Sequence, residues 1–396
     1  YDVGYDDAGH VLGAEVTMVS NAGHSADLSA PVMTRALCHF DNSYWLPHVD
    51  MHGFCARTNT QSNTAFRGFG GPQGALAIEV IMDSIARQLG ADPLAVRRAN
   101  FYGTTDHNVT PYEQVVEDNI IHALVDDLVA RSDYTQRRAD IAAYNTTSPV
   151  LKKGLALTPV KFGISFNVVH FNQAGALVHV YTDGTVLVNH GGTEMGQGLN
   201  TKVAQVVAHE LGIGLERVRA TATDTHKVAN TSATAASTGS DLNGKAAQAA
   251  ARQIRERLAA FALRHWGHVA DGEHALTLGD IHFAGDCIEI GRGGHLRQRI
   301  SFTELVREAY QARVQLWSDG FYATPGLHWD RVHLKGRPFH YFAYGAAVSE
   351  VLVDTLTGEH RVLRADLLHD VGASLNPAID LGQVEGAYVQ GLGWLT

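Results

Sequence analysis

Apolar and polar residues alternate along residues 12–18, and this period of two predicts a half-buried strand. Further on, isoleucine and leucine recur three and four residues apart between 78 and 89. That spacing predicts an amphipathic helix, which Gly90 is expected to end. A second helical segment covers 93–100, with Asp92 as its N-cap.

The second half of the chain mixes hairpins with helices. β-Branched runs flank Asp183-Gly184, a dipeptide typical of tight hairpin turns, and a later strand pair brackets the turn at Thr357-Gly358. An alanine-rich segment over 244–263 carries an apolar stripe at helical spacing, and a C-terminal helix is expected with Asp380 as its cap. Because hairpins and helices do not alternate regularly, we expect an α+β fold with mixed sheets and helices.

The chain has 396 residues, too many for one ordinary hydrophobic core, so two subdomains are expected. The polar stretch over 130–153 is the candidate boundary, which gives a first subdomain over 1–130 and a second over 131–396. No apolar run has the length that a membrane span needs, and no secretory signal is visible.

Charge and cysteine content narrow the classes of function. A net charge of −10 argues against a nucleic-acid-binding surface. The three cysteines, Cys38, Cys55 and Cys287, are far apart and form no CxxC pair, which favours a reducing, cytoplasmic setting. Three thiols are also too few for an iron–sulfur cluster with four cysteine ligands.

A glycine-rich stretch at 191–202, GGTEMGQGLNTK, runs directly into a segment with helical spacing. The first N–H groups of a helix are unpaired and favour an anion. Gly196 and Gly198 let a ligand approach the backbone, and Gln197 both donates and accepts hydrogen bonds. The stretch matches neither common nucleotide-binding pattern. A tight turn that only packs is the alternative interpretation.

Three further runs combine glycine or small hydroxyl residues with a helix start: AFRGFGGPQG at 65–74, TSATAASTGSDLNG at 231–244 and GQVEGAYVQG at 382–391. Arg67 and Phe69 share a face if the first run is extended, which suits an anionic cofactor and a planar substrate. The alternatives are a structural arginine, a serine-rich loop and helix packing. Together, the four runs predict a large, polar, anionic cofactor held mainly by backbone.

These runs, with TAAS at 234–237 and DVGASLNPAIDLGQVEGAYVQGLG at 370–393, resemble the molybdenum-binding part of the xanthine dehydrogenase and aldehyde oxidase family over nearly the whole chain. The resemblance implies a two-subdomain molybdopterin-binding domain of the molybdenum hydroxylase type. It implies that Arg67 and Ala236 lie beside the molybdenum. It also implies that the molybdopterin is held by Met195, Gly196, Gln197, Ala235, Ser237 and Gln383.

The purine-oxidising branch of this family has an arginine in a stretch similar to MTRALCHFDN, here Arg35, which aldehyde oxidases lack. By the same resemblance, Phe69 and Phe166 sandwich the substrate ring, and Asn167 stands where family members commonly have threonine. Aromatic rings grip a flat purine by face and edge. Arg35 is expected to stabilise the negative charge that builds on the ring under attack.

Two segments of the family have no counterpart in this sequence: the Gly-Glu-Pro-Pro segment with the general-base glutamate, and an upstream glycine-rich stretch with further cofactor contacts. We therefore expect the central part of a molybdenum subunit, inactive by itself. The resemblance implies a dimeric xanthine dehydrogenase of purine catabolism, which converts hypoxanthine and xanthine to urate with oxygen from water. Electrons then pass to iron–sulfur, FAD and NAD modules elsewhere. The alternatives are a molybdenum hydroxylase for aldehydes or N-heterocycles and a catalytically silent cofactor-binding scaffold.

Overall fold

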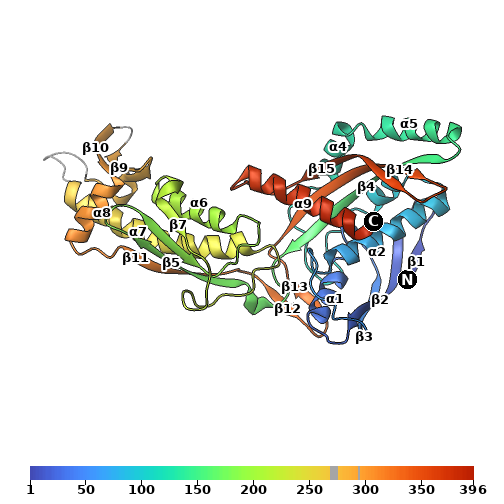
Figure 1. Ribbon diagram of the computed structural model, residues 1–396, viewed down its shortest axis with the longest axis horizontal. Helices are drawn as coiled ribbons and strands as arrows, with labels where there is room; N and C mark the ends of the chain where they lie inside the picture. Colours follow the sequence, from blue (N-terminus) through green and yellow to red (C-terminus); the bar gives the residue numbers. More distant parts are fainter. Residues whose placement is uncertain (268–274, 293–294) are drawn as a thin grey trace. The chain divides into compact units, whose positions relative to one another are not determined.

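Two compact units make up the chain (Figure 1), and the computed structural model describes residues 1–267, 275–292 and 295–396. Unit 1 comprises Tyr1–Asn167 and Gly326–Gly372, and unit 2 comprises Val168–Pro325 and Ala373–Thr396. Both units combine helices with sheets, so the predicted α+β class is confirmed. The boundary expected at 130/131 falls inside unit 1, and as a boundary between cofactor-binding subdomains it stays a prediction.

Unit 1 contains two three-stranded sheets. In the first, β2 (Val11–Gly23) pairs with antiparallel β1 (Asp2–Tyr5) and parallel β3 (Val49–Arg57). In the second, the long strand β14 lies between two antiparallel neighbours, and the turn at Thr357-Gly358 joins it to β15 as predicted. The remaining strands of the unit are β4 (Leu151–Ile164), β12 (His328–Asp330), β13 (Lys335–Arg337), β14 (Tyr341–Asp354) and β15 (His360–His369).

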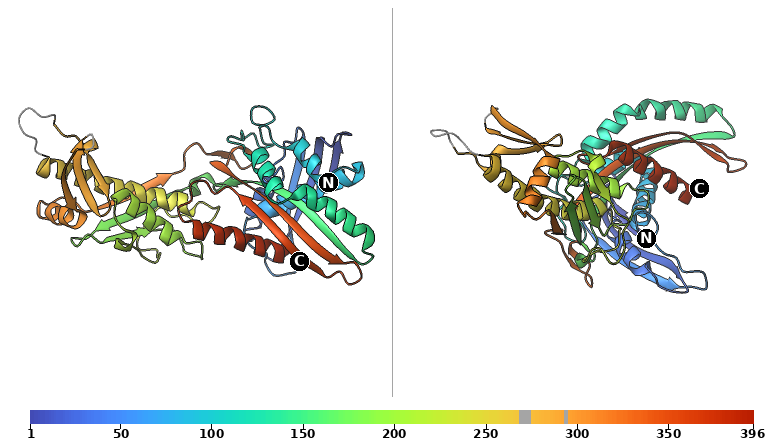
Figure 2. Two further views of the ribbon diagram at one scale, coloured as in Figure 1. Left: turned by 90° about the horizontal axis from the view of Figure 1, so that it is seen from above. Right: turned by 60° about the vertical axis from the view of Figure 1, so that its left-hand side comes forward.

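The helices of unit 1 follow the predicted spacing and ends. Ile78 and Ile81 of α2 are buried, and Gly90 ends this helix with a positive φ of 65°. Asp92 caps α3 because its carboxylate accepts the N–H of Leu94 at 3.1 Å. Figure 2 shows α5 beside the strand β4. The helices are α1 (Ser29–Leu37), α2 (Gly71–Leu89), α3 (Pro93–Asn100), α4 (Ile121–Arg131) and α5 (Tyr134–Thr147).

Unit 2 is built on a four-stranded sheet in the order β11-β5-β6-β7. The predicted hairpin joins β5 and β6, with Gly184 at a φ of 81° in its turn. A second sheet has the order β10-β9-β8. The strands are β5 (Gln173–Val180), β6 (Val186–His190), β7 (Val218–Ala220), β8 (Ile281–Ala284), β9 (Cys287–Arg292), β10 (His295–Ser301) and β11 (Trp317–Ala323).

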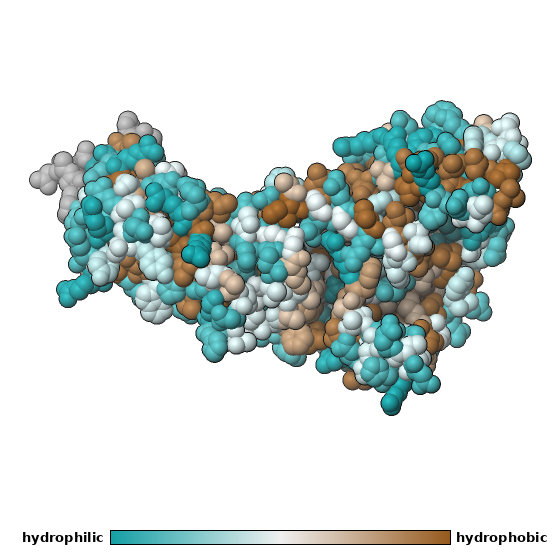
Figure 3. Space-filling model, in the orientation of Figure 1, coloured by the Kyte–Doolittle hydropathy of each residue, from teal (hydrophilic) through white to brown (hydrophobic). Residues whose placement is uncertain are grey.

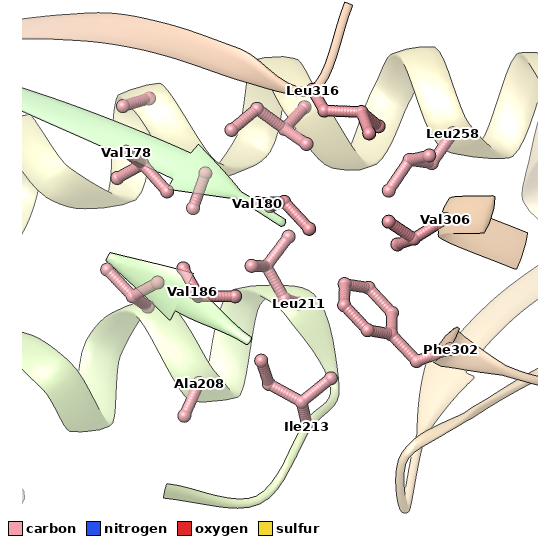
Figure 4. Packing of buried hydrophobic residues seen from close by; sticks show 14 of the residues in the cluster. Val178, Val180, Val186, Ala208, Leu211, Ile213, Leu258, Phe302, Val306 and Leu316 are labelled. Atoms are coloured by element: carbon pink, nitrogen blue, oxygen red, sulfur yellow. The ribbon is translucent and has the colours of Figure 1, made fainter. Parts of the chain in front are cut away.

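One core fills unit 2, formed by the sheet and the helices α6 (Leu199–Leu211), α7 (Gly239–Trp266) and α8 (Phe302–Gln311). Figure 4 shows side chains of this core, among them Val178 and Val186 of the sheet and Leu211, Leu258 and Val306 of the helices. The alanine-rich face of α7 allows the strand β11 to approach closely. A Cβ on Gly320 would lie 2.1 Å from the carbonyl oxygen of Ala246, so bulkier residues would separate them.

The last helix, α9 (Pro377–Leu395), begins one turn earlier than expected. Its cap is Asn376, whose side chain accepts the N–H of Ile379, so the prediction of Asp380 as the cap is wrong. Asp380 lies in the first turn and pairs with Lys202 at 2.6 Å. No residue of α9 is buried, and brown patches run along it in Figure 3. In the described part of the chain, no helix combines the length and apolar character that crossing a membrane requires.

Candidate functional site

The glycine-rich stretch over 191–198 forms the loop that leads into α6 of unit 2. The expected helix start is confirmed, and Glu194 of the same loop accepts one of its N–H groups. The carboxylate of Glu194 accepts the N–H groups of Gly196 and Gly198 at 2.9 Å each and that of Asn200 at 3.1 Å. The chain therefore supplies an anion of its own at this helix end, and the expectation that the loop contacts an anionic cofactor stays a prediction.

Gln197 also completes its own loop. Its side-chain oxygen accepts the N–H of Met195 at 2.6 Å, and its Nε2 donates to the carbonyl of Thr193 at 2.8 Å. These two bonds hold the loop so that Met195 stands out from it, 66% exposed. A Cβ on Gly196 would meet no described atom within 4 Å, so the backbone at this position is open to a ligand.

The structure brings three of the four runs together within unit 2. The N–H of Thr193 donates to the hydroxyl of Thr234 at 2.8 Å, which joins the first loop to the TAAS segment. Gln383 of α9 donates from Nε2 to the carbonyl of Gly196 at 3.3 Å. The fourth run lies inside α9 and not at its start, so a helix face, not a helix end, meets the loop.

The TAAS segment has a strained backbone at two predicted cofactor residues. Ala236 and Ser237 have φ angles of 56° and 57°, in the left-handed region that residues with a Cβ rarely adopt. Thr238 closes the turn by donating its N–H to the carbonyl of Ala235 at 3.2 Å. Such strain is maintained when surrounding contacts require one loop shape, as at ligand sites.

A buried polar layer supports these two loops. Nδ1 of His190 accepts the N–H of Gly192 at 3.1 Å, so Nε2 carries the proton of the neutral ring. Nε2 of His190 and the side-chain oxygens of Asn200 and Asn243 are buried and have no hydrogen-bond partner among the described residues. Burial lowers the pKa of His190, an effect that Asn200 and Asn243 oppose. Neutral His190 thus acts as a buried acceptor for the main chain of the first loop.

In unit 1, the run at 65–74 forms a turn and not an extended segment, so the shared face expected for Arg67 and Phe69 is wrong. The N–H of Phe69 donates to the carbonyl of Phe66 at 2.8 Å, and Phe69 has a φ of 52°. The turn lies against α1, because a Cβ on Gly70 would be 2.1 Å from the carbonyl oxygen of Val32. Arg67 is exposed, whereas Phe69 is half-buried.

Arg35 lies inside unit 1 and is 3% exposed. Its Nη1 donates to the carbonyl of Ser165 at 2.7 Å, and its Nη2 donates to the carbonyl of Gly163. The guanidinium carbon lies 5.0 Å from the ring centre of Phe162 and 4.9 Å from that of Phe339, a cation–π sandwich. Burial lowers the pKa of Arg35 to about 10.

No carboxylate within the described ranges forms an ion pair with Arg35, and its buried Nε has no hydrogen-bond partner there. A buried cation without a counter-ion is costly unless an anion or a developing negative charge joins it. Two main-chain carbonyls and two aromatic rings surround this guanidinium in place of a carboxylate, so its positive charge is not neutralised by an ion pair among the described residues.

Phe166 and Asn167 follow directly after the carbonyl that Arg35 binds, and both are half-buried. Ser165 between them and the strand β4 has a φ of 145°, a further strained position. The three predicted substrate segments around 35, 69 and 166 thus meet in unit 1. Phe162 links them, since a Cβ on Gly71 would lie 2.4 Å from its ring.

Sequence reasoning missed the residues that enclose Arg35. His39 follows Arg35 by four positions, the spacing of one helical face, and Phe162 lies at an even spacing before Phe166, as residues on one face of a strand do. Those two signals were available. Phe339 had none, because it reaches the site from a segment more than 300 residues after Arg35.

Comparison with known proteins shows the family to which this chain belongs. Two family profiles, each described as a molybdopterin cofactor-binding domain, match residues 127–396 and 1–101. The chain belongs to the molybdopterin cofactor-binding domain family. It is 44% identical over 396 residues to xanthine dehydrogenase/oxidase of Gallus gallus and 42% identical over 399 residues to xanthine dehydrogenase of Dictyostelium discoideum. In each case the match covers the whole of this chain and 27% of the relative.

Solved structures share the fold of this molybdopterin cofactor-binding domain protein. Quinoline 2-oxidoreductase from Pseudomonas putida 86 matches 97% of this chain and 48% of its own, with a TM-score of 0.79 and 21% identity. The Cu,Mo-CO dehydrogenase matches 98% of this chain and 49% of its own, with a TM-score of 0.82 and 20% identity. The predicted fold of the molybdenum hydroxylase type is therefore confirmed.

Proposed function

We propose that the joined loops of unit 2 hold the molybdopterin. Met195 is 66% exposed, the backbone at Gly196 has open space beside it, Gln197 holds the loop in shape, and Gln383 contacts this loop. Ala235, Ala236 and Ser237 add a turn whose strained shape fits a built binding loop. Arg67 of unit 1 is exposed and carries a positive charge that suits an anionic cofactor. The resemblance alone is the basis for proposing Arg67 and Ala236 as residues beside the molybdenum.

We propose further that the complete protein is a molybdenum hydroxylase of the xanthine dehydrogenase type, which converts hypoxanthine and xanthine to urate with oxygen from water. The observation that carries this proposal is Arg35, a buried guanidinium with no carboxylate partner among the described residues, in a chain 44% identical to xanthine dehydrogenase/oxidase. When bound, the molybdenum cofactor supplies the oxidative chemistry. Arg35 stabilises negative charge on the purine, and Phe69 and Phe166 contact its ring, with Asn167 beside them.

The remaining partners are proposals about the complete protein. All three cysteines are free thiols, too few for a cluster with four cysteine ligands. Electrons would therefore leave through iron–sulfur and FAD modules outside this sequence to NAD. Free thiols also favour a cytoplasmic location. The dimeric state is proposed from the resemblance alone.

The test is xanthine turnover by the full-length protein with Arg35→Met. Loss of one charge-stabilising donor is expected to lower kcat/KM for xanthine by roughly 100-fold or more. Arg87→Met, which removes an exposed arginine of α2, is the matched control and is expected to keep the activity. Unchanged xanthine oxidation in Arg35→Met would refute the purine assignment and favour an aldehyde or another N-heterocycle as substrate.

A further inference from the structure

His39 lies just after α1 and contacts the same groups that surround Arg35. Its Nδ1 lies 2.9 Å from the carbonyl oxygen of Arg35, one helical turn earlier. Its Nε2 accepts the main-chain N–H of Gly163 at 3.0 Å. His39 is 3% exposed, so both contacts are shielded from water.

These contacts fix the protonation state of the ring. Because the N–H of Gly163 points at Nε2, that nitrogen must be bare, and the proton resides on Nδ1 and is donated to the carbonyl of Arg35. Burial, together with the positive charges of Arg35 and Lys161, holds the pKa of His39 well below its ordinary value. His39 is therefore neutral, with one donor and one acceptor, and both are used.

Gly163 connects His39 to the guanidinium. Its N–H donates to His39, and its carbonyl accepts from Nη2 of Arg35. A side chain at this position is excluded, because a Cβ on Gly163 would lie 2.3 Å from the ring of Phe339. A shift of His39 therefore moves the acceptor that aims the guanidinium.

The aromatic pair around Arg35 also holds the imidazole. The ring of His39 lies 4.6 Å from that of Phe162 and 5.2 Å from that of Phe339, centre to centre. The guanidinium carbon of Arg35 lies at about the same distance from both rings, at 5.0 and 4.9 Å. Imidazole and guanidinium thus occupy one aromatic cage, so the orientation of one constrains that of the other.

We propose that His39 is a positioning residue for Arg35: it holds the main chain at Gly163 and thereby aims the guanidinium at the substrate. This inference rests on the proposed function, since it gives Arg35 its role. His39 does not touch the substrate. It acts on those substrates that need the charge of Arg35 and leaves the others unaffected.

The experiment uses the full-length protein with Arg35→Met, His39→Leu, His39→Gln and the double variant Arg35→Met/His39→Leu. Each is assayed with xanthine and with benzaldehyde, an uncharged substrate. His39→Leu is expected to lower kcat/KM for xanthine about tenfold, equivalent to about 1.4 kcal/mol, and to leave benzaldehyde oxidation unchanged. Glutamine keeps a donor and an acceptor, so His39→Gln is expected to recover most of the xanthine activity.

The double variant separates positioning from general stability. If His39 acts through Arg35, His39→Leu adds no further loss once Arg35 is methionine. An equal loss with both substrates, or additive losses in the double variant, would overturn the inference. So would full xanthine activity in His39→Leu.

The outcome for Arg35→Met distinguishes the two proposals. If Arg35→Met loses xanthine activity and His39→Leu does not, only the inference about His39 fails. If Arg35→Met itself keeps xanthine activity, the proposed function and the inference fail together. Molybdenum content is measured for every variant. If His39→Leu fails to fold, the ratio of xanthine to benzaldehyde activity in His39→Gln decides: a lowered ratio supports the inference, and an unchanged ratio overturns it.

Discussion

The carboxylate of Glu194 accepts the main-chain N–H of Asn200 at 3.1 Å and so closes the N-terminal end of α6. The same carboxylate binds the N–H groups of Gly196 and Gly198. Burial raises the pKa of the Glu194 carboxyl, but the hydrogen bonds that it accepts from Asn200 and Gly198 lower it more. The pKa of Glu194 is therefore below its ordinary value. One side chain thus organises the loop proposed to hold the cofactor.

Replacing Glu194 with alanine is expected to loosen this loop. The change removes an acceptor from several N–H groups at a helix start, which is worth about 1 kcal/mol where the site is exposed. Urea unfolding measures the stability, and metal analysis of the full-length protein measures molybdenum per chain, which is expected to fall. Glu256→Ala, an exposed carboxylate of α7, is the control. Full molybdenum content in Glu194→Ala would contradict the proposed role of the loop.

A second prediction concerns the buried ion pair in unit 1. Nζ of Lys161 lies 3.2 Å from Oδ2 of Asp41, and both side chains are 1% exposed. Tyr102 donates to the same oxygen at 2.6 Å. Lys161→Met leaves the carboxylate buried without its cation and is expected to reduce the free energy of unfolding by about 3–5 kcal/mol.

Chemical denaturation of the chain measures this loss, and an exposed ion pair of the same unit is the control. Lys335 pairs with Glu113 at 2.9 Å, with side chains 45% and 64% exposed, so Lys335→Met is expected to change stability by less than about 1 kcal/mol. Adding Asp41→Asn to Lys161→Met removes the stranded charge and is expected to restore part of the loss. Equal effects of Lys161→Met and Lys335→Met would show that burial of the pair is not what makes it important.

Local sequence signals predicted the elements because the deciding contacts are local. Asp92 bonds a residue two positions away, and the turn at Asp183-Gly184 needs only its own backbone angles. The prediction of Asp380 as the helix cap failed because its deciding contact is not local. Its carboxylate is drawn to Lys202, 178 residues earlier, and Asn376 caps the helix in its place.

In the candidate site, too, the features set by local sequence were predictable and those set by distant contacts were not. The glycine-rich runs identified the loops, since close backbone approach leaves a compositional trace at positions such as Gly71. Glu194 was visible in the first run, but its hydrogen bonds depend on how the loop turns back on itself. Phe339 comes from a distant segment, and no spacing within the sequence links it to Arg35. Predicting such a cage needs the fold.

A third prediction is that acid weakens the fold through His39. Its pKa is well below the ordinary value of 6.5, mainly because of burial. At a pH below 6.5 but above the lowered pKa of the folded state, His39 binds a proton in the unfolded chain and remains neutral in the folded chain. Stability is therefore complete above about pH 6.5 and falls as the pH decreases below it, by at most about 1.4 kcal/mol per pH unit for one histidine.

Urea unfolding at pH 7.5 and 5.5 measures this dependence, and His39→Gln is expected to reduce it. Some dependence will remain, because burial also lowers the pKa of His190 and His369. His226→Gln, an exposed position in the segment before α7, is the control and is expected to behave as the unmodified chain does. The same pH dependence in His39→Gln as in the unmodified chain would mean that His39 is not excluded from protonation.

The last prediction contrasts two glycines in helices. In α2, a Cβ on Gly74 would lie 2.2 Å from the carbonyl oxygen of Ala36, so Gly74→Ala forces α1 away and is expected to destabilise unit 1 by about 1–3 kcal/mol. In α9, a Cβ on Gly391 would meet no described atom within 4 Å. Gly391→Ala is therefore expected to stabilise this chain by roughly 0.5–1 kcal/mol through helix propensity.

Comparing this chain with the full-length protein makes the contrast more informative. Thermal unfolding of the chain alone tests the intrinsic effect of Gly391→Ala, and destabilisation there would contradict the open surroundings of α9. If Gly391→Ala stabilises the chain but lowers molybdenum content or stability in the full-length protein, the small residue is needed for a contact that the chain alone does not make. Gly74→Ala is expected to destabilise both, because the atoms that it meets all belong to unit 1.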